Sequence, residues 1–361
     1  MNKLLLILIL FPCFIFGQQT INDSILINGT YRSFITYVPS IYQSSQPTPL
    51  IFNLHGRTST ALEQMWYGDF RDIADTANFI IVHPQGLLDN TGVTHWNLGQ
   101  SNIDDIGFLN SLYSHLVSNY NINLDQVYST GMSNGGYMSY YLACNMNDKI
   151  AAIASVTGAM DSFTLLNCNP NHPTPVMEIH GTADFNVPFN DIINGIEYWR
   201  DYNNCNLIAD TTLMPDLNFG DLSTVKHIVY NNGDNGVTTE LFKVLNGGHT
   251  WPGSNISIGV TNYDINASIE IWKFFSRYDI SGLIYQSTSV TEYITKKDNH
   301  ITIKGGTKLS IILEVIITRF RSISRTIQNI ESSRSHVLCK FYLKTDDGNT
   351  VQVIVCDFAG I

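Results

Sequence analysis

The stretch from Gly131 to Gly135 places a serine between two glycines. It reads Gly-Met-Ser-Asn-Gly, and Gly-x-Ser-x-Gly is typical of a sharp turn from a strand into a helix that exposes the serine hydroxyl. Glycine suits so tight a turn because it carries no Cβ. Alone the pattern is weak, since a chain of this length would show it by chance about one time in ten. Ser133 is a candidate nucleophile if other residues can activate it.

A serine nucleophile requires a base that accepts its proton and an acid that orients the base. Asp184 follows the apolar stretch PVMEIHG, and His249 follows ELFKVLNGG in a glycine-rich turn. The chain order of serine, aspartate and histidine is that of the α/β-hydrolase arrangement. Asp184 and His249 are therefore the expected acid and base. The other candidates, which fit less well, are Asp161 and Asp191 as acids and His55, His180 and His227 as bases.

The oxyanion that forms during attack on a carbonyl group needs N–H donors. We expect the backbone N–H groups of Asn134, directly after the serine, and of Arg57, in the loop after the stretch LHG. Trp96 and Trp251 stand in loops expected at the same edge of the fold, where their rings could stack on a sugar or a phenolic ring. Burial in the core is the alternative interpretation of both tryptophans.

Short apolar stretches, most of them ending in glycine, alternate with stretches of helical spacing. Strands are expected at 49–56, 79–86, 126–131, 151–158, 175–181 and 240–249, and helices at 59–78, 102–120, 135–146 and 266–278. Before them, residues 24–40 predict a hairpin that turns at Asn28-Gly29. The alternation predicts an α/β fold, the α/β-hydrolase fold, with a mostly parallel central sheet and helices on both faces. Asp104 and Asp105 begin one of the helices and are expected to be structural.

Composition and the N-terminus limit the class of protein. The chain has 361 residues, of which 14% are charged, and its net charge is −11. A nucleic-acid-binding protein would need a basic face, so this class is excluded. Residues 1–17 carry one lysine, then an apolar run and a final glycine, which predicts a secretory signal peptide. We expect a secreted or cell-surface protein without a membrane attachment after cleavage; a membrane anchor is the alternative.

Export would permit disulfide bonds. Five of the six cysteines follow residue 17, so at least one has no partner within the chain. Cys144 ends the helix after the serine and Cys168 precedes the next strand, so a bridge between them would clip the intervening loop to the sheet. Two buried thiols are the alternative.

Five stretches, in order along the chain, resemble the secreted polyhydroxybutyrate depolymerase and feruloyl esterase family of α/β hydrolases. They are LHG, NIDDIGFL, VYSTGMSNGGYMSYYLAC, HGTADFNVPF and GGHTWPG. The resemblance covers about residues 25–277 and implies Ser133 as nucleophile, Asp184 as acid and His249 as base. Its members cleave esters of aromatic acids, acetyl groups on polysaccharides, or hydroxyalkanoate polymers.

Two positions depart from this family. Arg57 stands where a small residue or a cysteine is common, which affects the shape expected for the oxyanion loop. Cys205 often has a partner in the strand before the histidine, but here that region reads VYNNGDNG. Cys205 is therefore expected to be unpaired.

The C-terminal part, residues 285–361, differs in character because basic residues gather in it although the rest is acidic. Its end, from SSRSH to DFAG, resembles the segment between the two nucleotide switches of a kinesin motor. A motor would need a phosphate-binding loop of the pattern Gly-x-x-x-x-Gly-Lys-Ser/Thr, which this sequence lacks. We expect a non-functional tail, disordered or loosely attached, behind an esterase domain at 18–284.

These observations predict a secreted serine ester hydrolase that works through an acyl-enzyme without a metal or cofactor. Its partner is expected to be an ester substrate linked to a polymer: a feruloyl or acetyl ester of a plant polysaccharide, or a polyhydroxyalkanoate. A peptidase on the same fold is one alternative. A non-catalytic carbohydrate-binding surface protein is another, although all three residue types of the triad are present.

Overall fold

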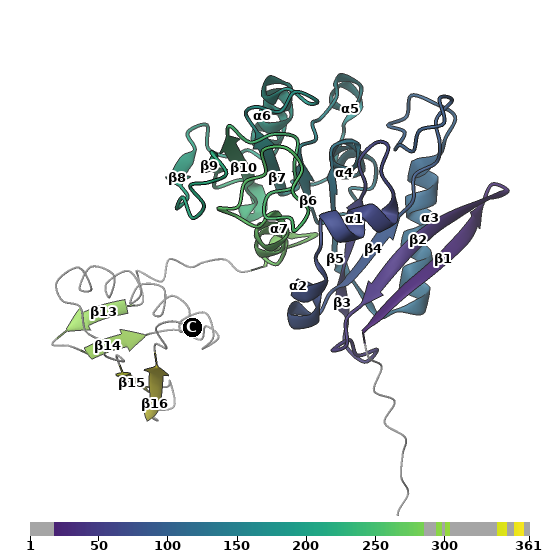
Figure 1. Cartoon of the computed structure of the whole chain (residues 1–361). Helices are drawn as coiled ribbons and strands as arrows, with labels where there is room; N and C mark the ends of the chain where they lie inside the picture. The colour runs from purple at the N-terminus through teal and green to yellow at the C-terminus, as the bar shows by residue number, and fades with distance from the viewer. Residues whose placement is uncertain (1–17, 285–293, 298–299, 304–337, 345–349, 357–361) are drawn as a thin grey trace, which may run out of the picture. The chain divides into compact units, whose positions relative to one another are not determined.

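The computed structural model describes residues 18–284 and four strands further on (294–297, 300–303, 338–344 and 350–356). A ten-stranded sheet forms the core of residues 18–284. The strand order is β1-β2-β4-β3-β5-β6-β7-β10-β9-β8 (Figure 1). The strands from β4 to β10 in this order run parallel, and the outer ones are antiparallel. The strands are β1 (Gln19–Ile27), β2 (Thr30–Val38), β3 (Thr48–Leu54), β4 (Ile80–Pro84), β5 (Ile122–Met132), β6 (Ala152–Val156), β7 (Val176–Gly181), β8 (Asp210–Leu213), β9 (Thr224–Tyr230) and β10 (Thr239–Leu245).

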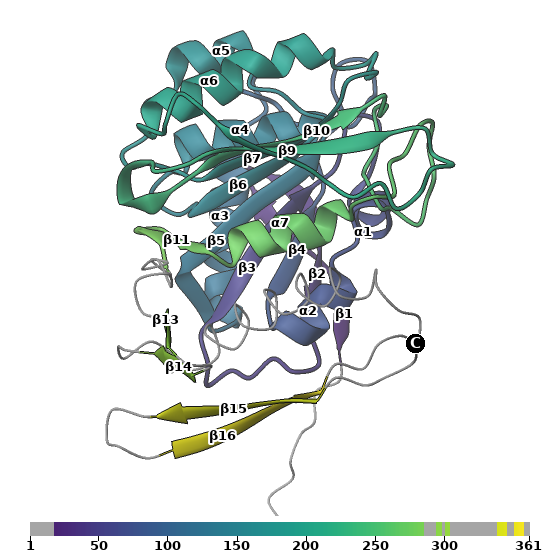
Figure 2. The same ribbon diagram turned by 90° about the vertical axis from the view of Figure 1, so that its left-hand side faces the viewer.

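Helices cover both faces of this sheet (Figure 2). They are α1 (Ala61–Tyr67), α2 (Arg71–Ala77), α3 (Asp105–Asn119), α4 (Asn134–Asn145), α5 (Ser162–Asn167), α6 (Ile193–Tyr202) and α7 (Ala267–Phe275). Side chains of α3, α4 and α6 share one core with the sheet, and side chains of α1, α2 and α7 share the other. Val127 and Tyr128 of β5 enter opposite cores, because successive side chains of a strand point to opposite faces. The architecture predicted from the sequence is thus observed.

Two local predictions had different outcomes. The β1–β2 hairpin turns at Asn28 and Gly29, which have φ values of 49° and 81°, as the Asn-Gly signal predicts. The single helix expected over 59–78 is instead two helices, because α1 ends at Gly68. A Cβ at Gly68 would lie 2.7 Å from Gln64 Nε2 and about as close to the Trp251 ring, at 3.0 Å.

A disulfide joins Cys144 to Cys168, whose Cα atoms are 4.9 Å apart. It closes a loop with a sequence separation of 24 residues, for which chain entropy predicts a stabilisation of about 3 kcal/mol. Cys205 is buried as a thiol, 3.9 Å from the carbonyl oxygen of Val237. Burial raises the pKa of this thiol, so it is a packing residue.

The chain divides into two units, Met1–Tyr285 and Gln286–Ile361. Tyr278–Asp279 (β11) and Gly282–Leu283 (β12) pair at the end of the first unit. In the second, β13 (Ile294–Lys297) pairs with β14 (His300–Ile303), and β15 (Leu338–Lys344) with β16 (Thr350–Cys356). The predicted signal peptide and most of the kinesin-like stretch lie outside the described residues. No described helix has the length and apolar character needed to cross a bilayer.

Candidate active site

Ser133 occupies the turn between β5 and α4 in a backbone conformation that is rare for a residue with a side chain. Its φ is 53° and its ψ is −119°, and its N–H donates to the Val156 carbonyl oxygen of β6 at 2.8 Å. The flanking glycines are required by close approach: a Cβ at Gly131 would lie 2.6 Å from the carbonyl oxygen of Leu54, and one at Gly135 would overlap with the same atom. The end of β3 therefore passes directly against this turn, and the strained serine is held in place.

Asp184 and His249 come together from the loops after β7 and β10. His249 Nδ1 lies 2.7 Å from Asp184 Oδ2, and the N–H groups of Asn186 and Val187 donate to Asp184 Oδ1 at 2.9 Å each. Burial alone would raise the pKa of Asp184, but the hydrogen bonds from His249 and Val187 outweigh it and lower that pKa. Asp184 is therefore ionised, with its side chain enclosed by the protein.

Several of the rival acids and bases have other roles in the structure. Asp161 caps α5 through the Thr164 N–H at 2.8 Å and accepts a hydrogen bond from Gln100. Asp191 lies in the short 3-10 helix Phe189–Ile192. Of the histidines, His227 bonds Glu240 at 2.8 Å, and burial lowers the pKa of His55 to about 4.

The expected oxyanion donors lie beside the serine. A Cβ at Gly56 would be 3.5 Å from the Ser133 Cβ, which places the loop after β3 against the nucleophile. Within the described part of the chain, no protein acceptor takes the backbone N–H of Arg57 or of Asn134. The Arg57 guanidinium points elsewhere: it binds Asp89 at 2.6 Å, with 56% of its side chain exposed.

A cavity of about 460 Å³ opens beside Ser133. Its walls come from the loops after β3 and β4, from α4 and from the start of α5: Arg57, Asp89, His95, Trp96, Asn97, Leu98, Gln100, Ser101, Asn134, Tyr137 and Asp161. Most of this wall is the loop of residues 89–101, for which the sequence predicted no role beyond Trp96. Carboxylate, amide and hydroxyl groups line the cavity together with aromatic rings, so it could bind a polar ligand that carries a ring.

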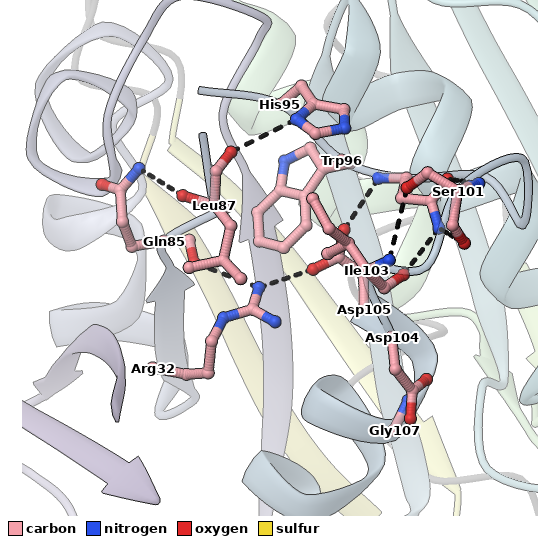
Figure 3. A network of polar contacts seen from close by, with 12 residues as sticks. Arg32, Gln85, Leu87, His95, Trp96, Ser101, Ile103, Asp104, Asp105 and Gly107 are labelled. Atoms are coloured by element: carbon pink, nitrogen blue, oxygen red, sulfur yellow. Dashed lines mark hydrogen bonds and ion pairs between the residues drawn. The ribbon is translucent and has the colours of Figure 1, made fainter. Parts of the chain in front are cut away.

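A buried ion pair holds this loop in place (Figure 3). Arg32 Nη2 of β2 lies 2.5 Å from Asp105 Oδ1, and Asp105 Oδ2 accepts the N–H of Asn97 at 2.7 Å. Asn97 in turn donates from its side chain to the carbonyl oxygens of Ser101 and Ile103. Asp104 beside it only caps α3, accepting the Gly107 N–H at 2.7 Å. Both aspartates are structural, as expected, but the sequence did not reveal Arg32 as the partner.

The two tryptophans predicted to stack on substrate are core residues, each 1% exposed. Trp251 donates from its indole N–H to Ser268 Oγ at 3.1 Å and does not reach the cavity at Ser133. Trp96 donates its indole N–H to the carbonyl oxygen of His55 at 2.9 Å. Its backbone N–H donates to the Asn134 side-chain oxygen, and its carbonyl oxygen accepts from the Asn134 side-chain amide. The stacking prediction is therefore wrong for Trp251. Trp96 adjoins the cavity as part of its wall, without a free ring face.

Comparison with known proteins bears on the fold and on the type of reaction. A model of the Phospholipase/Carboxylesterase family matches residues 105–230. The chain is 26% identical over 271 residues to the bifunctional acetylxylan esterase/xylanase XynS20E of Neocallimastix patriciarum, covering 74% of this chain and 36% of that protein. It is 28% identical over 240 residues to a probable feruloyl esterase C of Aspergillus niger, covering 62% and 83%. A solved acetyl xylan esterase from Aspergillus awamori matches with a TM-score of 0.53 at 14% identity, covering 71% and 98%.

The chain thus spans about a third of the length of the bifunctional relative and most of the feruloyl esterase. The structural match supports the fold alone, because its sequence identity is low. The family model and the relatives add the type of reaction. Together they confirm the predicted α/β-hydrolase fold and the predicted enzyme class, a carboxylic ester hydrolase.

Proposed function

We propose that this protein is a secreted serine esterase that removes feruloyl or acetyl groups from plant polysaccharides. The observation that carries the proposal is the bond between His249 and Asp184, formed at the sheet edge where the strained Ser133 stands. The relatives named above supply the substrate classes: one is called an acetylxylan esterase and another a feruloyl esterase. The cavity of about 460 Å³ has room for an aromatic acyl group as well as for acetyl.

The proposed mechanism assigns one role to each group. Because His249 Nδ1 faces Asp184, Nε2 is the nitrogen left to take the Ser133 proton. Ser133 Oγ attacks the ester carbonyl carbon, and the N–H groups of Arg57 and Asn134 bind the oxyanion. His249 then gives its proton to the departing alcohol, which leaves an acyl-enzyme. Water, deprotonated by His249, attacks the acyl carbon and releases the carboxylic acid and Ser133.

Domain limits and export belong to the same proposal. We assign residues 1–17 to a signal peptide and residues 18–284 to the catalytic domain. The tail from 285 is proposed to be dispensable for catalysis. The disulfide bridge between Cys144 and Cys168 suits an oxidising compartment.

The test of the nucleophile uses a fluorophosphonate probe and a small aryl ester. Ser133→Ala should abolish labelling and lower kcat by about 10⁴-fold or more, and His249→Ala should lower kcat by a similar factor, because the residues act as a unit. Ser118→Ala is the control, since Ser118 is an exposed serine of α3 and does not line this cavity. Labelling that persists in Ser133→Ala would refute the assignment.

The substrate is tested separately with feruloyl, acetyl and hydroxyalkanoate esters and with a peptide. We expect turnover of feruloylated or acetylated xylan fragments. Preference for the hydroxyalkanoate would shift the proposal to a depolymerase, and preference for the peptide would overturn the esterase assignment.

A further inference from the structure

A second histidine contacts the proposed catalytic acid from behind. His180, on β7, has its Nε2 atom 3.5 Å from Asp184 Oδ2, the same oxygen that His249 binds. On its other side, His180 Nδ1 lies 3.0 Å from Glu178 Oε1. Tyr140 of α4 donates its hydroxyl to Glu178 Oε2 at 3.1 Å. All of these groups except His249 are buried, so they form a continuous polar chain inside the core.

The proton positions on His180 follow from its neighbours. Nε2 faces the Val187 carbonyl oxygen at 2.9 Å as well as Asp184, and both are acceptors, so Nε2 carries a hydrogen. Nδ1 faces a carboxylate whose other oxygen is already stabilised by Tyr140. Burial would lower the pKa of His180, but the hydrogen bond and the charge of Glu178 outweigh it and raise that pKa. Burial also raises the pKa of Glu178, but both ring nitrogens of His180 face oxygen acceptors, which is the arrangement of an imidazolium paired with a carboxylate.

We propose that the Glu178–His180 pair positions the Asp184 carboxylate and holds a positive charge behind it. His180 is thus a positioning residue that acts through Asp184, and the inference rests on the proposed roles of Asp184 and His249. The charge favours ionised Asp184 and disfavours a second cation on the same carboxylate.

Among the residues that the structure describes, no other charged group forms an ion pair with His180. Lys243, the β10 residue in register with His180, has its Nζ 4.6 Å from the centre of the Phe189 ring, which itself lies edge-on to His180. Other titratable groups on the surrounding elements include Tyr137 of α4, Asp191 of the 3-10 helix, and Glu197, Arg200 and Asp201 of α6. Arg200 lies 2.6 Å from Asp201 and 4.0 Å from Glu197. Asp184 and Glu178 are the partners that His180 contacts.

The test is the pH dependence of kcat/KM on a soluble aryl ester, measured with the full chain and normalised by fluorophosphonate titration of active sites. In His180→Gln and in Glu178→Gln the positive charge is lost. The acid limb should move to higher pH, because a positive charge beside the site is removed, and kcat should fall more than KM changes. His227→Gln is the matched control: His227 also pairs with a buried glutamate, Glu240, but at β9. Its acid limb should coincide with that of the unchanged protein.

Tyr140→Phe is a milder variant, for the case that the two glutamine variants do not fold. It removes only the hydroxyl that stabilises ionised Glu178, so it should shift the acid limb in the same direction by a smaller amount. If the acid limb stays in place in Tyr140→Phe and in whichever of the other two variants fold, His180 is merely structural and the inference is overturned. If Ser133→Ala remains active, the proposed function fails instead, so the two failures are distinguishable.

Discussion

Replacing Asp105 by asparagine should cost about 3–5 kcal/mol of the free energy of unfolding. The reason is the position of Arg32, whose side chain is 3% exposed and whose guanidinium carbon lies 3.9 Å from the centre of the Phe108 ring. Without the carboxylate, a buried cation loses its counter-charge. For a domain of this size, the loss corresponds to a fall in Tm of roughly 10 °C.

The assay is thermal and urea unfolding, with an exposed pair of the same chemistry as control. Arg200 Nε lies 2.6 Å from Asp201 Oδ1, but 57% of the Asp201 side chain is exposed, so Asp201→Asn should cost at most about 1 kcal/mol. Adding Arg32→Met to Asp105→Asn removes the stranded charge and should recover much of the stability. If Asp105→Asn cost no more than Asp201→Asn, the reasoning from the buried pair would be wrong.

Two further predictions concern acid stability and the end of the domain. Burial would raise the pKa of Glu240, but its hydrogen bond to His227 and the charge of Arg277 lower that pKa to about 2. Because the folded protein holds Glu240 ionised, the free energy of unfolding should fall as the pH drops from about 4.5 toward 2. A Tm series over this range should show a shallower decline for Glu240→Gln, and an equal decline would contradict the assignment. Truncation after Ile284 should preserve esterase activity and Tm. Truncation after Arg277 should lower Tm, because it removes Tyr278, which is buried and whose carbonyl oxygen accepts a hydrogen bond from the Tyr128 hydroxyl. Loss of activity in the longer form would show that the tail belongs to the fold.

Local patterns were sufficient to predict much of the fold and the elements that carry the candidate triad. The Asn28-Gly29 turn depends on two adjacent residues with positive φ, and the parallel strands depend on short apolar runs. Asp184 and His249 could be selected because each follows such a strand. These signals are contained in a few neighbouring residues, so a single sequence displays them.

The cavity wall could not be predicted in this way. It depends on Arg32 and Asp105, which are 73 residues apart and carry no shared local signal. The prediction that Trp251 stacks on substrate was wrong for a related reason. The sequence shows that Trp251 lies two residues after His249, but it does not show that the indole N–H bonds Ser268 in the core. Which polar partner a side chain finds in the core is decided by tertiary packing.

Backbone hydrogen bonds hold the candidate triad in two parts: Ser133 on one side, and Asp184 with His249 on the other. Ser133 is fastened to β6 through the Val156 carbonyl, whereas the loops of Asp184 and His249 are fastened to each other by the Ala183 N–H and the Gly247 carbonyl at 2.9 Å. Relative motion of these parts changes the distance from serine to histidine and leaves the Asp184–His249 bond intact. Displacement of the linked Asp184 and His249 loops would therefore change the serine-to-histidine distance before it changed the Asp184–His249 bond.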